Sequence, residues 1–223
     1  MQDYLIGIKT AYSGMTTTLA ITSVAVILGV AVGLLMALMK LSGNRFLKGI
    51  ATVYIEIIRG TPLLVQALII YFGLPQVLQS FGIAFRWENA IVASMLVCGL
   101  NSAAYMAEIV RAGIQAIDKG QMEAARSLGM THKQAMRLII IPQAFKVIIP
   151  PLGNEFITLI KETAVLSAIT VTEITRASML WASSTFNAWP AYLGTAFVYL
   201  SLTIPLSIAM NRLERRISKN VKG

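Results

Sequence analysis

Apolar residues in this chain are gathered into long blocks and do not recur at the spacing of a soluble amphipathic helix. Five blocks stand out, at residues 16–39, 50–77, 90–110, 145–163 and 190–210. A helix needs about 20 predominantly apolar residues to cross a hydrocarbon core of about 30 Å, which is roughly the length of each block. The second block is interrupted by Glu56, Arg59 and Pro62, so its membrane-spanning part is expected to begin near Thr61.

The five blocks predict an all-α, polytopic membrane protein with five transmembrane helices. Only helices and closed barrels satisfy every backbone polar group in lipid, and these blocks are too long and too unalternating for barrel strands. No low-complexity linker divides the chain, so residues 1–223 are expected to form a single transmembrane domain. The stretch 111–137 is predicted to lie in the cytoplasm, and the stretch 165–189 is predicted to be a loop on the other side.

Composition and charge support the membrane and set an orientation. The chain is 56% hydrophobic and only 13% charged, whereas soluble domains are about a quarter charged. Its net charge of +9 lies between the apolar blocks and in the tail, which favours membrane orientation over nucleic-acid binding. With the N-terminus outside, thirteen basic residues fall inside and three outside: Lys40, Arg45, Lys48, Arg111, Lys119, Arg126, Lys133, Arg137, Arg212, Arg215, Arg216, Lys219 and Lys222 against Lys9, Arg86 and Arg176. We therefore expect an outside N-terminus and a cytoplasmic C-terminus.

The cytoplasmic segment 118–142 carries local helix signals. Asp118 followed by Gln121 is typical of a capping box, and Gly129 is placed to end the first helix as its left-handed C′ residue. A second capping signature, Thr131 followed by Gln134, begins a helix that Pro142 is expected to kink toward the membrane. The segment is therefore predicted to be a helix–turn–helix on the inner surface.

The segment has two other interpretations. A DNA-reading helix–turn–helix is disfavoured, because the second helix runs within a few residues into a membrane span and hardly reaches a major groove. An amphipathic loop that lies on lipid headgroups without a partner is the other alternative.

The same segment resembles the EAA signature of ABC-importer permeases. The matching residues are Glu123, Ala124, Ala125, Gly129, Ile139 and Pro142, and the departure is Ile141, which stands where that signature has Leu. Further words resemble the polar amino-acid permeases, the histidine, glutamine and arginine importers: EIIRGTPLLVQ at 56–66, AYMAEIVR at 104–111, and NEF at 154–156 leading to LIKET at 159–163.

This resemblance implies a type I ABC-importer permease in a bacterial inner membrane. It implies that the coupling segment, residues 118–142, docks through Glu123, Ala124, Ala125 and Gly129 onto a cytoplasmic ATPase dimer, which would bind the ATP and Mg. It also implies a second permease subunit, with a homodimer favoured, and an extracytoplasmic solute-binding protein. The expected substrate is a polar or basic amino acid, and the expected partners otherwise are lipid and no nucleic acid.

Motifs for other chemistries are missing from the sequence. No GxxxxGK[ST] phosphate loop occurs, so ATP hydrolysis by the usual P-loop route is expected to belong to another polypeptide, and no cofactor is expected in this chain. His132 is the single histidine and Cys98 the single cysteine, which argues against a metal site and against a disulfide within the chain.

Polar residues at membrane depth are candidates for the transport pathway, because such groups are costly in lipid. Asn101, Tyr105 and Glu108 share one face of the third block, and Glu155, Thr158 and Glu162 share one face of the fourth. The hypothesis is that substrate contacts four residues: Glu155, Asn154, Asn101 and Thr158. The alternative is that these groups only hold the bundle, through hydrogen bonds and through ion pairs of Lys161 with Glu162 or of Glu108 with Arg111.

Two rival functions remain open at this point. An ion-coupled secondary transporter would use the carboxylates of Glu108, Glu155 and Glu162 for protons, although no inverted repeat supports it. A membrane scaffold would only recruit a cytoplasmic partner through residues 120–144. Uptake that needs ATP, as opposed to an ion gradient, separates the first rival from a permease, and the absence of any transport would indicate the second.

Overall fold

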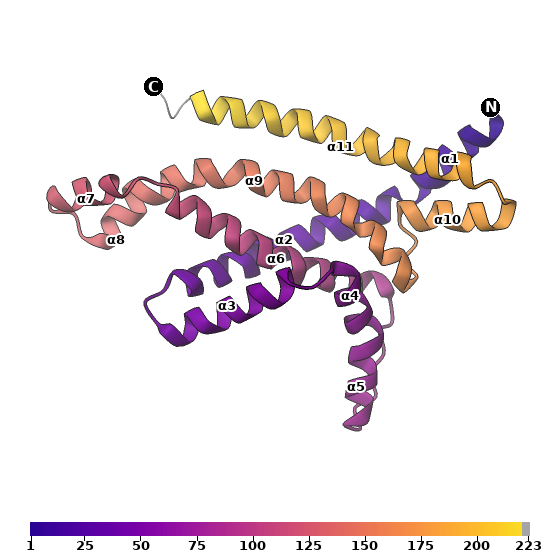
Figure 1. The fold of residues 1–223 in the computed structure, drawn as a ribbon, viewed down its shortest axis with the longest axis horizontal. Coiled ribbons are helices and arrows are strands. Elements are labelled where there is room, and N and C mark those ends of the chain that lie inside the picture. The colour runs from indigo at the N-terminus through magenta and orange to yellow at the C-terminus, as the bar shows by residue number, and fades with distance from the viewer. Residues whose placement is uncertain (220–223) are drawn as a thin grey trace.

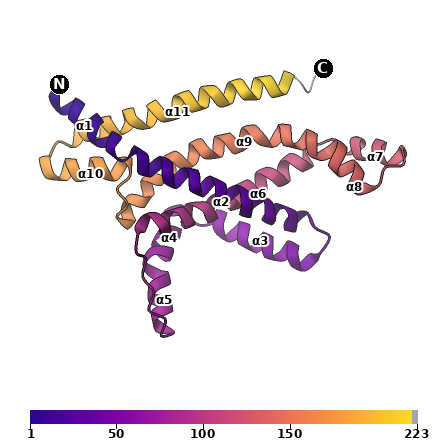
Figure 2. The same cartoon turned by 180° about the vertical axis from the view of Figure 1, so that it is seen from behind.

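The computed structural model describes residues 1–219, and these residues form helices without any strand (Figures 1 and 2). Five helical stretches are long and apolar enough to cross a membrane: Gln2–Leu41, Leu63–Ser80, Ala90–Gln115, His132–Ile169 and Ala188–Ile217. The prediction of an all-α protein with five spans is confirmed. Lys222, one of the basic tail residues, lies outside the described residues.

The first span is longer than predicted because a helix precedes it. α1 (Gln2–Ser13) and α2 (Met15–Leu41) meet at Gly14, whose Cα lies directly against the backbone of Glu173. No side chain fits at that approach. α1 packs along α11, and this contact holds it in place. The sequence did not include this segment in the first apolar block because it carries the charged residues Asp3 and Lys9.

The second span is broken where the sequence indicated. α3 (Arg45–Arg59), which the Asn44 side chain caps, ends before Pro62, and the chain continues through α4 (Leu63–Leu68), a π-helix (Ile69–Gly73) and α5 (Leu74–Ser80). A π-helix leaves carbonyl groups without their usual partner, and the indole N–H of Trp87 donates to the Ile70 carbonyl over 2.8 Å. α4 packs against α6, with Gln66 and Ala67 buried, whereas α5 projects away from the remaining helices (Figures 1 and 2).

α6 (Ala90–Gln115) is the most buried span and packs along α2. Small residues allow this close approach: a Cβ atom at Gly33 would lie 2.8 Å from the carbonyl oxygen of Ala103, and one at Gly99 would lie 3.0 Å from Cβ of Leu28. Small-residue interfaces are how helices associate in lipid, where no hydrophobic force draws them together. α2 and α6 therefore form a tightly packed pair at the centre of the fold.

The predicted helix–turn–helix connects α6 to the fourth span. α7 (Lys119–Ser127) and α8 (His132–Ala135) lead into a π-helix (Met136–Ile140) and then α9 (Ile141–Glu162). The π-helix ends two residues before Pro142, which stands in the first turn of α9, where its missing N–H is tolerated. We call the end of the molecule that holds α7 and α8 the α7 end (Figure 1).

The stretch 165–189 is not a loop, and this prediction was wrong. A 3₁₀-helix (Thr163–Ile169) and α10 (Ile174–Thr185) occupy most of it, followed by α11 (Ala188–Lys219), which runs back toward the α7 end (Figure 1). Its core residues Leu166, Ile169 and Ile174 are fully buried. We call this opposite end, with α1 and α10, the α10 end.

Candidate functional site

The first helix of the coupling segment is capped by Asp118. Its Oδ1 accepts the Gly120 backbone N–H over 2.6 Å, as the predicted cap requires. The reciprocal half of the predicted capping box is absent, since Gln121 does not return a bond to Asp118 and instead accepts from the Gln143 amide over 3.4 Å. Gln121 thereby links α7 to α9.

The turn after α7 depends on Gly129, as predicted. Gly129 has a φ of 85°, its N–H donates to Arg126 over 3.0 Å, and the Met130 N–H donates to Ala125 over 3.2 Å. This pair of bonds is the Schellman motif, which favours glycine because a Cβ is strained at positive φ. The Arg126 guanidinium adds a bond to the Met130 carbonyl over 2.7 Å. The turn is therefore fixed by its own residues.

The second capping box is complete. The Thr131 N–H donates to Oε1 of Gln134 over 2.8 Å, and the Gln134 N–H donates to Oγ1 of Thr131 over 3.3 Å. The prediction of this cap is confirmed. Both helices of the segment thus carry caps built from neighbouring residues, so their shape does not require another chain.

The proposed docking residues lie mostly at the surface of α7. Glu123, Ala124 and Gly129 are exposed, whereas Ala125 is only 5% exposed and packs inward. Leu128, which sequence reasoning did not single out, is 84% exposed beside them. The segment presents a short, rigid, partly apolar surface at the α7 end.

The four candidate substrate residues divide between two helices and differ in exposure. Asn101 on α6 is 3% exposed, Glu155 and Thr158 on α9 are half-buried, and Asn154 is exposed. The Ser102 hydroxyl donates to Oε1 of Glu155 over 3.2 Å, so α6 and α9 are joined at this level.

Asn101 already has a partner in the protein. Its amide donates to Oε1 of Gln66 over 3.0 Å, and Gln66 in turn donates to the carbonyl groups of Ile58 and Thr61 at 2.7 and 3.0 Å. Gln66 thus satisfies the backbone at the break between α3 and α4. Sequence reasoning missed this role, although an amide in an apolar span was the available signal.

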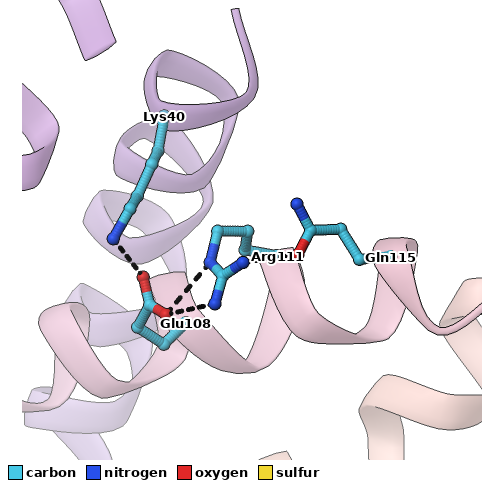
Figure 3. Close-up of polar contacts among 4 residues, drawn as sticks. All are labelled: Lys40, Glu108, Arg111 and Gln115. Carbon is cyan, nitrogen blue, oxygen red and sulfur yellow. Dashed lines mark hydrogen bonds and ion pairs between the residues drawn. The ribbon is translucent and has the colours of Figure 1, made fainter.

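Glu108 holds two cations at the α7 side of the bundle (Figure 3). Its Oε1 lies 2.7 Å from Nζ of Lys40 on α2, and its Oε2 lies 2.8 Å from a terminal guanidinium nitrogen of Arg111 on α6. The pair of Glu108 with Arg111 was anticipated as the structural alternative, and Lys40 was missed because it lies 68 residues away. The other anticipated pair, Lys161 with Glu162, is not formed within residues 1–219.

Glu173 is a buried carboxylate that sequence reasoning also missed. It caps α10 by accepting the N–H groups of Thr175 and Arg176 at 2.8 and 2.7 Å, and it accepts the Tyr199 hydroxyl from α11 at 2.9 Å. Burial raises the pKa of the Glu173 carboxyl above its usual range, and these donors partly lower it again. An acidic cap before an apolar helix was the signal available in the sequence.

Five apolar spans, with a self-capped helical segment between the third and the fourth, define a polytopic membrane protein. Residues 29–219 match the family of binding-protein-dependent transport system inner membrane components. The chain belongs to this family and is a multi-pass inner-membrane permease subunit, as the sequence predicted.

This chain is similar to curated relatives and to a solved structure over nearly its whole length. A probable glutamine ABC transporter permease of Bacillus subtilis is 39% identical over 207 residues, covering 93% of each chain. An arginine transport system permease of Corynebacterium glutamicum is 40% identical, covering 98% of this chain and 71% of its own length. A crystal structure of an amino acid ABC transporter with histidines matches with 48% identity and a TM-score of 0.85, covering 93% of this chain and 94% of that one.

Family membership decides between the rival functions. Members are inner-membrane components of transport systems that depend on a binding protein. This description fits a permease and neither a free-standing ion-coupled transporter nor a scaffold that transports nothing. The fold is that of ABC-importer permeases, as the resemblance implied.

Proposed function

We propose that this chain, as a homodimer, forms the translocation pathway of an ATP-driven importer for a polar or basic amino acid. The observation that carries the proposal is the 48% identity, over 93% of the chain, to an amino acid ABC transporter solved with histidines. The named substrates of the relatives, glutamine and arginine, agree with this class. An extracytoplasmic binding protein delivers the amino acid at the α10 end, where the N-terminus is outside.

The motor is a separate ATPase dimer, which binds ATP and Mg. Each ATPase docks on the coupling segment, residues 118–142, through Glu123, Ala124 and Gly129, with Ala125 packed behind them. The exposure of these surface residues and the self-contained caps support this assignment. Since the segment joins α6 directly to α9, movement of α7 would reach the two helices that carry the polar residues.

Substrate passes beside those polar residues, and Glu155 is the leading contact among them. Its carboxylate, which accepts one hydroxyl from Ser102, has further acceptor sites for an ammonium or guanidinium group. Asn154 and Thr158 accompany it on α9. Asn101 contributes only the part of its amide that Gln66 does not use. A carboxylate of this kind suits a cationic amino acid.

The function is tested by reconstituting the permease with its ATPase in proteoliposomes. We expect uptake of labelled arginine, histidine or glutamine that requires the binding protein outside and ATP at the ATPase. An ion gradient imposed without ATP serves as the control. Uptake that proceeds on the gradient alone would contradict the proposal, and so would ATP hydrolysis without uptake of any of the three amino acids.

The role of Glu155 is tested by Glu155→Gln in the same system. We expect loss of uptake of cationic amino acids with less effect on glutamine, because the variant keeps the shape and loses the charge. Glu88→Gln, at an exposed glutamate of the connection between α5 and α6, is the matched control. Unchanged uptake of arginine and histidine by Glu155→Gln would overturn direct contact.

The docking surface is tested by Glu123→Ala. We expect weaker copurification of the ATPase and a matching fall in substrate-stimulated ATP hydrolysis. Glu88→Ala is the matched control, because Glu88 is an exposed glutamate of the connection between α5 and α6, outside the coupling segment. Equal copurification of both variants with the ATPase would remove Glu123 from the docking surface.

A further inference from the structure

The ion pairs of Glu108 join two helices that have different relations to the coupling segment. α6 ends at Gln115, three residues before the cap of α7, whereas α2 leads into α3 and has no direct chain connection to α7. The Glu108 cluster, defined as Lys40, Glu108 and Arg111, ties the last turn of α2 to α6 two turns above that junction. Figure 3 shows Lys40 reaching across from the neighbouring helix.

The cluster is continuous with the end of α6. Both oxygens of Glu108 are engaged, Oε2 accepts two guanidinium N–H groups of Arg111 at 3.0 and 2.8 Å, and another guanidinium nitrogen of Arg111 donates to Gln115. Gln115 is the last residue of α6. A displacement of α7 therefore acts on the residue that is bonded to Arg111, and through Glu108 on Lys40.

Apolar packing and the ion pair together hold the end of α2, where Ala37 is fully buried against Ala104 and Ala107 of α6. Higher in the bundle α2 touches α6 through Gly29 and Gly33, which lie against the Ser102 side chain and the Ala103 carbonyl oxygen. Among residues 1–217, the bond of Lys40 to Glu108 is the ion pair that connects different helices. The side chains of Lys40 and Glu108 are 16% and 15% exposed, so solvent screens the pair less than a surface pair.

We propose that Glu108 is a positioning residue for transport: its bond to Lys40 makes α2 follow α6 when the coupling segment moves. Without the bond, α6 and α9 still respond to the ATPase, while the end of α2 and α3 after it follow α6 less closely. ATP is then hydrolysed with less amino acid moved per cycle. This inference rests on the proposed docking of an ATPase on α7.

The charge arrangement identifies a clean variant. Removing Glu108 leaves the cations Lys40 and Arg111 beside each other without their shared partner, which risks misfolding. Removing Lys40 leaves Glu108 still paired with Arg111 on the same helix, so no charge is stranded. Lys40→Met keeps much of the apolar stem, and Lys40→Arg restores a cation that reaches Glu108.

The test measures ATP hydrolysed and amino acid imported by the reconstituted complex. For Lys40→Met we expect the amino acid moved per ATP to fall by about fivefold, the lower end of ordinary coupling between sites. ATPase copurification and the melting temperature should stay near those of the unchanged protein. Lys40→Arg should restore the ratio. Lys48→Met, at an exposed lysine of α3, is the matched control and should leave it unchanged.

Two outcomes would overturn the proposal. If the unaltered complex transports and Lys40→Met imports the same amount of amino acid per ATP, the bond has no role in coupling. A melting temperature that falls in step with both activities, at a constant ratio, would assign the bond to stability alone. Failure of the unaltered complex to transport any amino acid counts instead against the proposed function.

Discussion

The two short helices that connect membrane spans, α7 and α10, are held in opposite ways. α7 is capped by residues within its own segment: Asp118 at its start and Gly129 at its end. α10 is capped by Glu173, but that carboxylate also accepts Tyr199 from α11, and the backbone N–H of Ile174 donates to Thr18 on α2 over 3.4 Å. The first helix is supported locally and the second by distant parts of the chain.

The local support of α7 and the long-range support of α10 indicate different roles for the two ends of the molecule. A helix that holds its own shape has its outer surface free, as the 84% exposure of Leu128 illustrates, and such a surface suits a partner. A helix whose cap is a fully buried Glu173 is part of the core and fixes α1, α10 and α11 relative to each other. The following substitutions break one arrangement or the other.

The largest effect is expected from Glu173→Ala. The change leaves the N–H groups of Thr175 and Arg176 without their acceptor, which costs about 3 kcal/mol, while the Tyr199 hydroxyl keeps its bond to Oγ1 of Thr175. Thermal unfolding of the detergent-solubilised protein should show a clear fall in melting temperature. The control Glu88→Ala removes an exposed carboxylate and should cause no comparable fall. Equal melting temperatures for the two variants would mean that α10 is not anchored in this way.

This contrast also explains which elements could be predicted. Each span was visible because its own residues are apolar, and the caps at Thr131 and Gly129 because their bonds join residues at most five positions apart. α1 and α10 were missed because α11 and Gly14 support them from far along the chain. Sequence patterns report local interactions, whereas packing between distant segments requires the fold.

A smaller and local effect is expected from Gly129→Ala. Gly129 has a φ of 85°, and a Cβ there meets nothing within 4 Å, so the cost comes from backbone strain alone, about 1.5 kcal/mol. Hydrogen–deuterium exchange should become faster in α7 and its turn while α10 is unaffected. Gly43→Ala, at an open position without a positive φ, should leave exchange unchanged. Faster exchange that spreads to α10 would show that the two ends are not independent.

The candidate site followed the same division. Glu155 and Asn101 could be singled out from the sequence, because a polar residue within an apolar span is unusual whatever the tertiary structure. Their partners, Ser102 and Gln66, could not be assigned, since the pairs join residues 53 and 35 positions apart. From the sequence, Lys40 was only one of the basic residues expected on the cytoplasmic side, and its pairing with Glu108 is visible only in the fold.

Thr131→Ala is expected to act on α8 by about 1 kcal/mol, the usual cost of losing a cap. The change removes the hydroxyl that accepts the Gln134 N–H over 3.3 Å. Exchange should quicken in the first turn of α8 without a shift in melting temperature. His132→Ala, at the exposed neighbouring position, keeps the cap and is the control. A lowered melting temperature for Thr131→Ala alone would indicate that α8 is tied into the global core.

The smallest effect is expected from pH, again at Glu173. Burial raises the folded-state pKa of this carboxyl, although the donors from Thr175, Arg176 and Tyr199 offset part of the rise. In the unfolded chain the carboxyl has a pKa of about 4.3. As pH increases, the unfolded chain therefore releases the proton before the folded protein does. The stability that protonation contributes is complete below the unfolded pKa and is lost as pH rises through the folded pKa.

The melting temperature of the unaltered protein, relative to that of Glu173→Gln, should therefore decline as pH rises above about 4 and through the raised folded-state pKa. Glu173→Gln carries no titrating proton, so it removes this dependence and leaves the other groups in place. A relative melting temperature that rises over the same range would mean that hydrogen bonds outweigh burial and hold the folded carboxyl below its usual pKa. Glu173 would then cap α10 as a carboxylate anion, and the caps of α10 and α7 would differ only in that Glu173 is buried and Asp118 is exposed.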